Sequence, residues 1–305
     1  MTTPESIDYP ILHNVFHPSD FSPASETAFA HALTAALMAK AGLTILHVAP
    51  ERETEWMEFP GVRETLERWG LLPRNSSRAD VSKLGIDVKK VKTVHQDPVE
   101  SVTAYLATHA TDLIVLATDQ SKGAIPWSSK SVAVPIARAS RQMTLFVPKG
   151  VDGFVSTQDG SISLRSILIP VASIPPAQPA VQAAVRMAIR LNCSSGVFTV
   201  LHVGEGGDMP DVRLPDIPGW RWNKVTRQGD VIDVVCQMAQ ETKAGLIVMC
   251  TDGRNGFLDA LRGSHSERVL RRSPCPLLAI PAGGFIASVL EAESEGNAAS
   301  RRREE

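Results

Sequence analysis

Two glycines in the last third of the chain frame a segment with the chemistry of an anion-binding site. Gly253 is followed by nine residues and then by the pair Gly263-Ser264, and a helix-forming run over 267–272 comes soon afterwards. Glycine has no Cβ, so the backbone can approach a bound group closely. The first N–H groups of a helix have no partners inside the helix and therefore attract negative charge. This spacing predicts a phosphate-binding loop within residues 253–266.

Polar side chains inside the loop fit the same chemistry. Arg254 can add positive charge, and the hydroxyls of Ser264 and Ser266 can donate to phosphate oxygens. His265 can contact a phosphate or simply begin the helix. An ordinary turn followed by a helix start is the alternative interpretation of the whole segment. No GxxxxGK[ST] run occurs in the sequence, so the loop is not of the Walker type.

The sequence gives little support for catalysis or for a metal site. It contains neither a GxSxG nucleophile elbow nor an HExxH motif. Asp252 could position a metal-bound water beside the loop, but Asp119 holds the matching place earlier in the chain, which equally fits a turn-capping role. His17 and His95 near strand ends leave a metal site as a minor alternative. We therefore predict no catalytic residue and no bound metal in the protein itself.

An internal repeat indicates the strands and helices that position this loop. The run Asp112-Leu-Ile-Val-Leu-Ala-Thr-Asp119 returns as Gly245-Leu-Ile-Val-Met-Cys-Thr-Asp252, and Val147-Pro148 returns as Ile280-Pro281 at the same separation. Ile45-Leu-His-Val48 returns as Val200-Leu-His-Val203 at a longer separation. The chain is thus expected to hold two copies of one domain, the first with an insertion over 51–84. That insertion is expected to pack against the first copy, with cover for a ligand site or an apolar ligand as alternatives.

Each copy alternates short apolar runs with stretches of helical spacing. We expect strands in the first copy at 12–17, 43–49, 87–94, 112–118 and 143–148, and in the second at 166–171, 197–203, 221–227, 245–250 and 277–281. The runs lack polar alternation, which is typical of strands covered on both faces. The sequence therefore predicts an α/β fold with two tandem, doubly wound, parallel five-stranded sheets that form an internal pseudo-dimer.

Composition and sequence pattern predict the domain boundaries and exclude several classes of protein. We expect domains at 10–149 and 166–284, a linker or surface hairpin at 150–165, and a disordered tail at 285–305. The net charge of −2 argues against a nucleic-acid-binding surface. No apolar run is long enough to cross a bilayer, and the N-terminus lacks the pattern of a signal peptide. The four cysteines form no CxxC pair, so we expect reduced thiols in a cytoplasmic protein.

With these motifs in place, the chain resembles the universal stress protein family in its tandem two-domain type. That family carries a Gly-x-x-Gly-(nine residues)-Gly-Ser/Thr loop after its fourth strand, which binds ATP phosphates. Gly253 and Gly263-Ser264 match this loop, as does the following Glu-Arg-Val-Leu-Arg-Arg-Ser-Pro-Cys-Pro-Leu-Leu-Ala-Ile-Pro run. Cys250 stands where the family has its first glycine. In the first copy all three loop glycines are missing.

The resemblance also assigns residues around the nucleotide. Asp20 in the first copy matches the family's Asp near the ribose, whereas the second copy has Ala172 there. Val203, and Val48 in the first copy, match the backbone contact to adenine. Gly229 matches the Gly-Asp that follows the third strand. The two copies thus have complementary losses, and the resemblance implies that the nucleotide lies in the second copy.

The resemblance implies a stress-response regulatory protein that binds ATP, with or without Mg²⁺, and hydrolyses it slowly at most. It also implies a homodimer with an unknown protein partner. A nucleotide-free scaffold, acting as a signalling pseudo-dimer through protein partners, is the alternative, because Ala172 and Cys250 both weaken the site. An enzyme of the wider adenine-nucleotide α/β superfamily is a more distant alternative.

Overall fold

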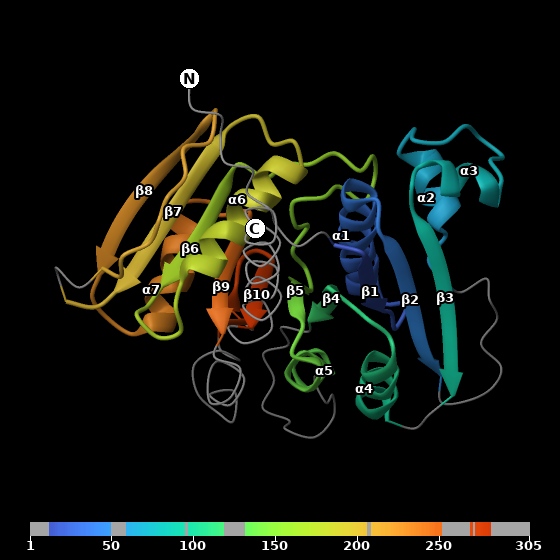
Figure 1. The fold of residues 1–305 in the computed structure, drawn as a ribbon, viewed down its shortest axis with the longest axis horizontal. Coiled ribbons are helices and arrows are strands. Elements are labelled where there is room, and N and C mark those ends of the chain that lie inside the picture. The colour runs from blue at the N-terminus through green and yellow to red at the C-terminus, as the bar shows by residue number, and fades with distance from the viewer. Residues whose placement is uncertain are drawn as a thin grey trace, which may run out of the picture.

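The computed structural model describes residues 12–49, 59–94, 97–118, 132–205, 209–251, 269–270 and 272–281. Within these residues, ten strands form one continuous sheet in the order β3-β2-β1-β4-β5-β10-β9-β6-β7-β8 (Figure 1). The strands are β1 (Asn14–Pro18), β2 (Gly42–Ala49), β3 (Asp87–Val94), β4 (Leu113–Thr118), β5 (Met143–Pro148), β6 (Ser166–Val171), β7 (Gly196–Val203), β8 (Trp220–Arg227), β9 (Leu246–Thr251) and β10 (Leu277–Pro281). Every predicted strand is present, within two residues of its expected bounds.

The two copies meet through an antiparallel pair in the middle of this sheet. Strands β1 to β5 pair in parallel with one another, and so do β6 to β10. Between the copies β5 runs antiparallel to β10, with Leu145 opposite Leu278 and Phe146 opposite Leu277. The predicted tandem α/β fold is confirmed, and the two five-stranded sheets are joined into one. Figure 1 shows the second copy on the left and the first on the right of this junction.

Helices cover both faces of the sheet, which explains why its inner strands are apolar, whereas the outer strands β3 and β8 carry polar and charged residues and are more exposed than predicted. One face carries α1 (Pro23–Ala39) and α6 (Gln178–Arg190), and the other carries α4 (Pro98–Thr108), α5 (Ala133–Ser140) and α7 (Val231–Glu241). Neighbouring strand residues alternate between the two cores: Val15 packs on the α1 face and Phe16 on the opposite one. Each core runs across both copies, so burial of apolar surface stabilises the pair as a unit.

The segment between the copies is a hairpin packed into the core. Val155 bridges Ile162 in antiparallel fashion, and the N–H of Ser163 donates to the carbonyl of Phe154 at 2.9 Å. The side chains of Phe154, Val155 and Leu164 are buried in the α1 face of the core. The segment was expected as a linker or surface hairpin. It forms the hairpin, but its apolar side chains point inward.

The insertion of the first copy packs against this hairpin. It contains α2 (Val62–Arg68) and α3 (Arg78–Lys83). Phe59, Trp69 and Leu72 are buried, and the indole N–H of Trp69 donates to the carbonyl of Thr157 at 3.3 Å. Packing was the expected role, and the described part of the insertion has it. Trp56 lies outside the described residues.

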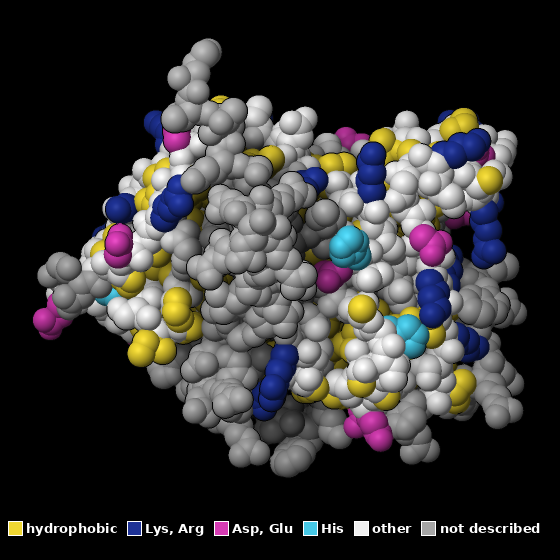
Figure 2. Space-filling view, viewed as in Figure 1, with side chains coloured by type: hydrophobic (Ala, Val, Ile, Leu, Met, Phe, Trp, Pro, Cys, Tyr) yellow, Lys and Arg dark blue, Asp and Glu magenta, His cyan; other side chains and the backbone are white. Residues whose placement is uncertain are grey.

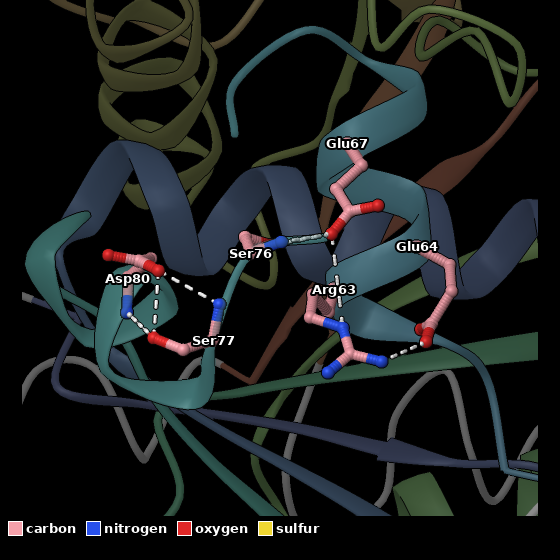
Figure 3. Close-up of polar contacts among 6 residues, drawn as sticks. All are labelled: Arg63, Glu64, Glu67, Ser76, Ser77 and Asp80. Atoms are coloured by element: carbon pink, nitrogen blue, oxygen red, sulfur yellow. Dashed lines mark hydrogen bonds and ion pairs between the residues drawn. The ribbon is translucent and has the colours of Figure 1, made fainter. Parts of the chain in front are cut away.

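Polar contacts fix the turn between α2 and α3 (Figure 3). Glu67 accepts hydrogen bonds from the backbone N–H and the hydroxyl of Ser76, at 2.8 and 2.7 Å. Ser77 and Asp80 form a reciprocal capping box at the start of α3. The two helices therefore keep a fixed arrangement above the sheet.

No helix in the described part of the chain has the length and apolar character needed to cross a membrane.

Candidate functional site

The second copy brings three predicted site positions to one edge of its sheet. Val171, the last residue of β6, lies opposite His202 in β7, and Val203 lies opposite Arg227, the last residue of β8. Ala172 follows β6 directly and is exposed, Val203 ends β7 and is half-buried, and Gly229 comes two residues after β8. Ala172, Val203 and Gly229 therefore lie at the carboxyl ends of three adjacent strands.

The predicted phosphate loop leaves the sheet at the same edge. β9 pairs with β6 and ends at Thr251, whose hydroxyl donates to the carbonyl of Ile280 at 3.3 Å. Strand β6 is where the order reverses, because β7 lies on one side of it and β9 on the other. Ligands of doubly wound sheets bind at this reversal, beyond the carboxyl ends. The predicted loop residues lie outside the described residues: Gly253, Arg254, Gly263, Ser264, His265 and Ser266.

Gly229 and Asp230 together start helix α7. Gly229 has φ of 134°, a backbone conformation that favours glycine, and a Cβ there would lie 3.1 Å from the Val234 side chain. Asp230 caps the helix by accepting the N–H groups of Ile232 and Asp233, each at 3.1 Å. Asp97 caps α4 in the first copy in the same way. Neither cap was predicted, although an Asp directly before each helical run is a recognisable signal.

Two repeated histidines join the first two strands of each copy. The Nδ1 of His47 lies 2.7 Å from the carbonyl oxygen of Ser19, and the Nδ1 of His202 lies 3.2 Å from that of Val171. Both carbonyls belong to the chain at the end of the copy's first strand. The matched contacts give these histidines a structural role.

In the first copy, Asp20 organises the chain that leads from β1 into α1. Its carboxylate accepts the backbone N–H of Ser22 at 3.0 Å, and Ser22, not Asp20, caps the helix through the N–H of Ser25. Partial burial opposes ionisation of Asp20, but hydrogen bonds from Ser22 and Ser25 outweigh it and hold the carboxyl pKa below its ordinary value. Asp20 is therefore charged at neutral pH and lies two residues beyond the end of β1.

Aromatic side chains gather beside Asp20 and Val48. The ring of Phe21 stacks on His47 with centroids 3.9 Å apart, and Phe59 from the insertion meets Phe21 edge-on at 5.4 Å. Val48 is half-buried near the end of β2. The second copy has Ser173, which is small and exposed, where the first has Phe21. The two strand-end regions thus differ in aromatic bulk.

A comparison with family models matches the universal stress protein family over residues 12–148 and 218–281, which is more than half of the chain. The chain belongs to the universal stress protein family. No curated protein matches its sequence.

Solved structures with this fold include other universal stress proteins. One from Archaeoglobus fulgidus DSM 4304 is 16% identical, with a TM-score of 0.60 over 89% of this chain and 97% of that one. A functionally unknown protein from Pseudomonas aeruginosa PAO1 is 12% identical, with a TM-score of 0.56 over 93% of this chain and 98% of that one. A universal stress protein in complex with cAMP is 18% identical, with a TM-score of 0.33 over 46% of this chain and 100% of that one.

The buried imidazole of His17 in this universal stress protein is held in its neutral form. Burial lowers the pKa of His17 to about 4, and its Nδ1 lies 3.0 Å from the carbonyl oxygen of Val115. Its proposed metal partner His95 lies outside the described residues, and the described part of the chain contains no group of three or more His, Cys, Asp and Glu side chains able to hold a metal ion. A neutral, buried imidazole suits a core position.

The cysteines of the universal stress protein are thiols without disulfide partners, as expected. Burial raises the pKa of Cys250 to about 11 and that of Cys275 to about 12. Because the thiolate is the reactive form, the raised pKa lowers the reactivity of these two side chains at neutral pH. Cys250, which replaces a family glycine, packs inward from β9 and leaves the strand edge free of its side chain.

Proposed function

We propose that this stress-response protein binds ATP, with or without Mg²⁺, in its second copy. One observation carries the proposal. Ala172, Val203 and Gly229 lie at or just after the carboxyl ends of β6, β7 and β8, and β9, which pairs with β6, ends at the same edge, directly before residues 253–266. An adenosine lying along Ala172 and Val203 would direct its phosphates toward that segment. The glycines of its sequence and the predicted helix start would supply N–H donors for phosphate oxygens.

The first copy supports this choice by contrast. Phe21 stacks on His47 and Phe59 packs edge-on against Phe21, at the strand ends where an adenosine bound to the first copy would be expected to lie. The loop of the first copy also lacks the glycines that let a backbone approach phosphate. We therefore assign the nucleotide to the second copy alone, at one ATP per chain, with hydrolysis slow at most.

Calorimetric titration with ATP and Mg²⁺ tests this assignment. Gly263→Asp places a carboxylate where phosphate would bind, so its heat of binding should vanish while the circular dichroism spectrum stays unchanged. The matched control is Lys130→Asp, the equivalent position of the first copy, which should bind ATP like the native chain. Retained ATP binding in Gly263→Asp would refute the site assignment.

A nucleotide-free scaffold is the second candidate, and the methyl group of Ala172 in place of a ribose-binding carboxylate favours it. In that case the pseudo-dimer would act through protein partners alone. Native, folded protein that gives no heat with ATP and Mg²⁺ would decide for the scaffold.

We also propose a homodimer and a cytoplasmic location, the latter in keeping with four unpaired thiols.

Basic side chains lie on both outer strands of the sheet. They affect which surface two chains could use to form a homodimer. Lys89, Lys90 and Lys92 lie on β3, and Arg221 and Lys224 lie on β8. Figure 2 shows Lys and Arg side chains at both ends of the molecule. Like charges on an exposed edge disfavour strand addition. The homodimer is therefore proposed to form through helical faces, and light scattering would measure its mass.

A further inference from the structure

An apolar groove crosses the junction between the two copies. It has a volume of about 120 Å³ and lies between α1 and α6, above the β5–β10 pair. Its apolar lining comes from both copies and includes Ala35, Met38, Leu145, Ala183, Met187 and Leu278. Met38 keeps 40% of its surface exposed, although it faces this groove. Apolar side chains that cover such a groove would be removed from water, which favours their docking there.

The chain itself leaves the sheet beside this groove. Leu278 of β10 is part of the lining, and the described chain ends three residues later at Pro281. Three extended residues span roughly 10 Å. Residues 282–305 continue from that point, so their first residues begin within reach of the groove. Gly283-Gly284 allows the sharp reversal that such a return requires.

The sequence after the two glycines matches the groove in character. Phe285, Ile286, Val289 and Leu290 fall at positions i, i+1, i+4 and i+5, which share one face of a helix. A helix over these six residues is about 9 Å long, a length suited to a short groove. No charged residue interrupts this run.

The charges next to the groove and after the apolar run also favour docking. Arg186 and Arg190 of α6 contribute to the groove wall. Glu291, Glu293 and Glu295 come directly after the apolar run. A segment whose apolar side chains enter the groove would carry these carboxylates out along the basic side of α6.

We propose that residues 285–290 of the same chain bind in the groove between α1 and α6 and hold the two copies together. Attachment at Pro281 gives the segment a high effective concentration, so modest apolar contacts suffice. This inference replaces disorder by docking for the first six residues of the expected tail, and it leaves the polar remainder as predicted. It does not depend on nucleotide binding.

Hydrogen–deuterium exchange on the full chain tests the docking. Phe285→Ser combined with Leu290→Ser removes the apolar contacts without touching the folded core. Exchange in the groove-facing turns of α1 and α6, residues 31–39 and 183–191, should then rise by roughly tenfold or more, because the burial of two large apolar side chains is lost. Ala298→Ser with Ala299→Ser is the matched tail control and should leave exchange unchanged. Equal exchange in the native chain and the Phe285/Leu290 variant would overturn the proposal.

A cross-link distinguishes the docked segment from a second chain. In a Cys193→Ser background, Met187→Cys with Ile286→Cys should form a disulfide within one chain under mild oxidation. Met187→Cys with Ala299→Cys is the control and should not. Cross-linked dimers would assign the groove to another copy of the chain, and no cross-link would leave the groove without its proposed occupant. Either result overturns the inference.

Discussion

His31 on α1 accepts a hydrogen bond from the backbone N–H of Phe154, 123 residues later in the chain, with 3.1 Å between Nε2 and N. The opposite ring nitrogen, Nδ1, lies 2.8 Å from the carbonyl oxygen of Thr27 and must donate to it. The side chain is buried and meets the Phe154 ring edge-on at 4.5 Å. One imidazole, fixed in one neutral tautomer, thus ties the first copy to the hairpin that leads into the second.

This bond predicts that acid weakens the fold through His31. Burial lowers the pKa of His31 to about 4, so the unfolded chain binds the proton first, near its ordinary pKa. The stabilisation is complete above the unfolded pKa and is lost as pH falls toward 4. Between pH 7.5 and pH 5 the free energy of unfolding should drop by on the order of 2 kcal/mol from this group. His17, with its pKa also lowered to about 4 by burial, adds a similar amount.

Urea unfolding at pH 7.5 and pH 5 measures the effect. His31→Gln keeps an acceptor for Phe154 and removes the titration, so its stability should depend less on pH than that of the native chain. His13→Gln changes an exposed histidine and serves as the control. A pH dependence identical to the native one in His31→Gln would contradict the assignment.

The hairpin glycine beside His31 predicts a strong position-specific effect. Gly153 has φ of 73°, and a Cβ there would lie 2.3 Å from Cε1 of the His31 ring. Gly150 has φ of 78° and no atom within 4 Å of such a Cβ. Gly150→Ala should therefore cost only backbone strain, about 1 kcal/mol. Gly153→Ala should cost roughly 1–3 kcal/mol more, because the buried ring cannot move away freely. Urea unfolding measures both variants. An equal decrease in the free energy of unfolding would show that the His31 ring moves aside without cost and would contradict the prediction.

The strands were predictable because their signal is local. Runs such as Leu113–Thr118 and Leu246–Thr251 are apolar without alternation, and that pattern reports burial on both faces. The repeat then fixed the order of elements, since two similar copies must fold alike. The positions of Ala172, Val203 and Gly229 at one sheet edge followed from the same reasoning.

The contacts between the copies were not predictable from local patterns. Nothing in the run 143–148 tells that β5 will pair with β10, because that pairing is set by how two finished sheets meet. The contact of His31 with Phe154 and the stack of Phe21 on His47 likewise depend on residues distant in the chain. The phosphate loop remains a prediction, because its residues lie outside the described part of the structure.

The cap at Asp230 predicts a structural and not a ligand-binding effect. Loss of an N-cap carboxylate leaves two helix N–H groups without their partner, so Asp230→Ala should lower the free energy of unfolding by about 1 kcal/mol. Asp97→Ala should cost a similar amount in the first copy. Asp230→Asn keeps the acceptor and should retain both stability and the calorimetric heat of ATP binding. A loss of ATP binding in Asp230→Asn would instead give the carboxylate a direct role with the nucleotide.

Restoring a carboxylate at the end of β6 should strengthen nucleotide binding in the second copy. Ala172 is exposed and follows Val171, so Ala172→Asp should leave stability unchanged. A hydrogen bond from a ribose hydroxyl to a charged acceptor contributes roughly 1.5–3 kcal/mol, so ATP should bind about 10- to 100-fold more tightly in calorimetric titration. The neutral Ala172→Asn separates charge from shape and should gain less.

The equivalent change in the first copy completes this test. Asp20→Ala removes the carboxylate that stands in the same place after β1 and accepts the N–H of Ser22. If the nucleotide lies in the second copy, this variant should bind ATP with native affinity. A loss of ATP binding in Asp20→Ala, with no gain in Ala172→Asp, would move the nucleotide to the first copy, where the Phe21 ring would have to swing away from His47 to admit it.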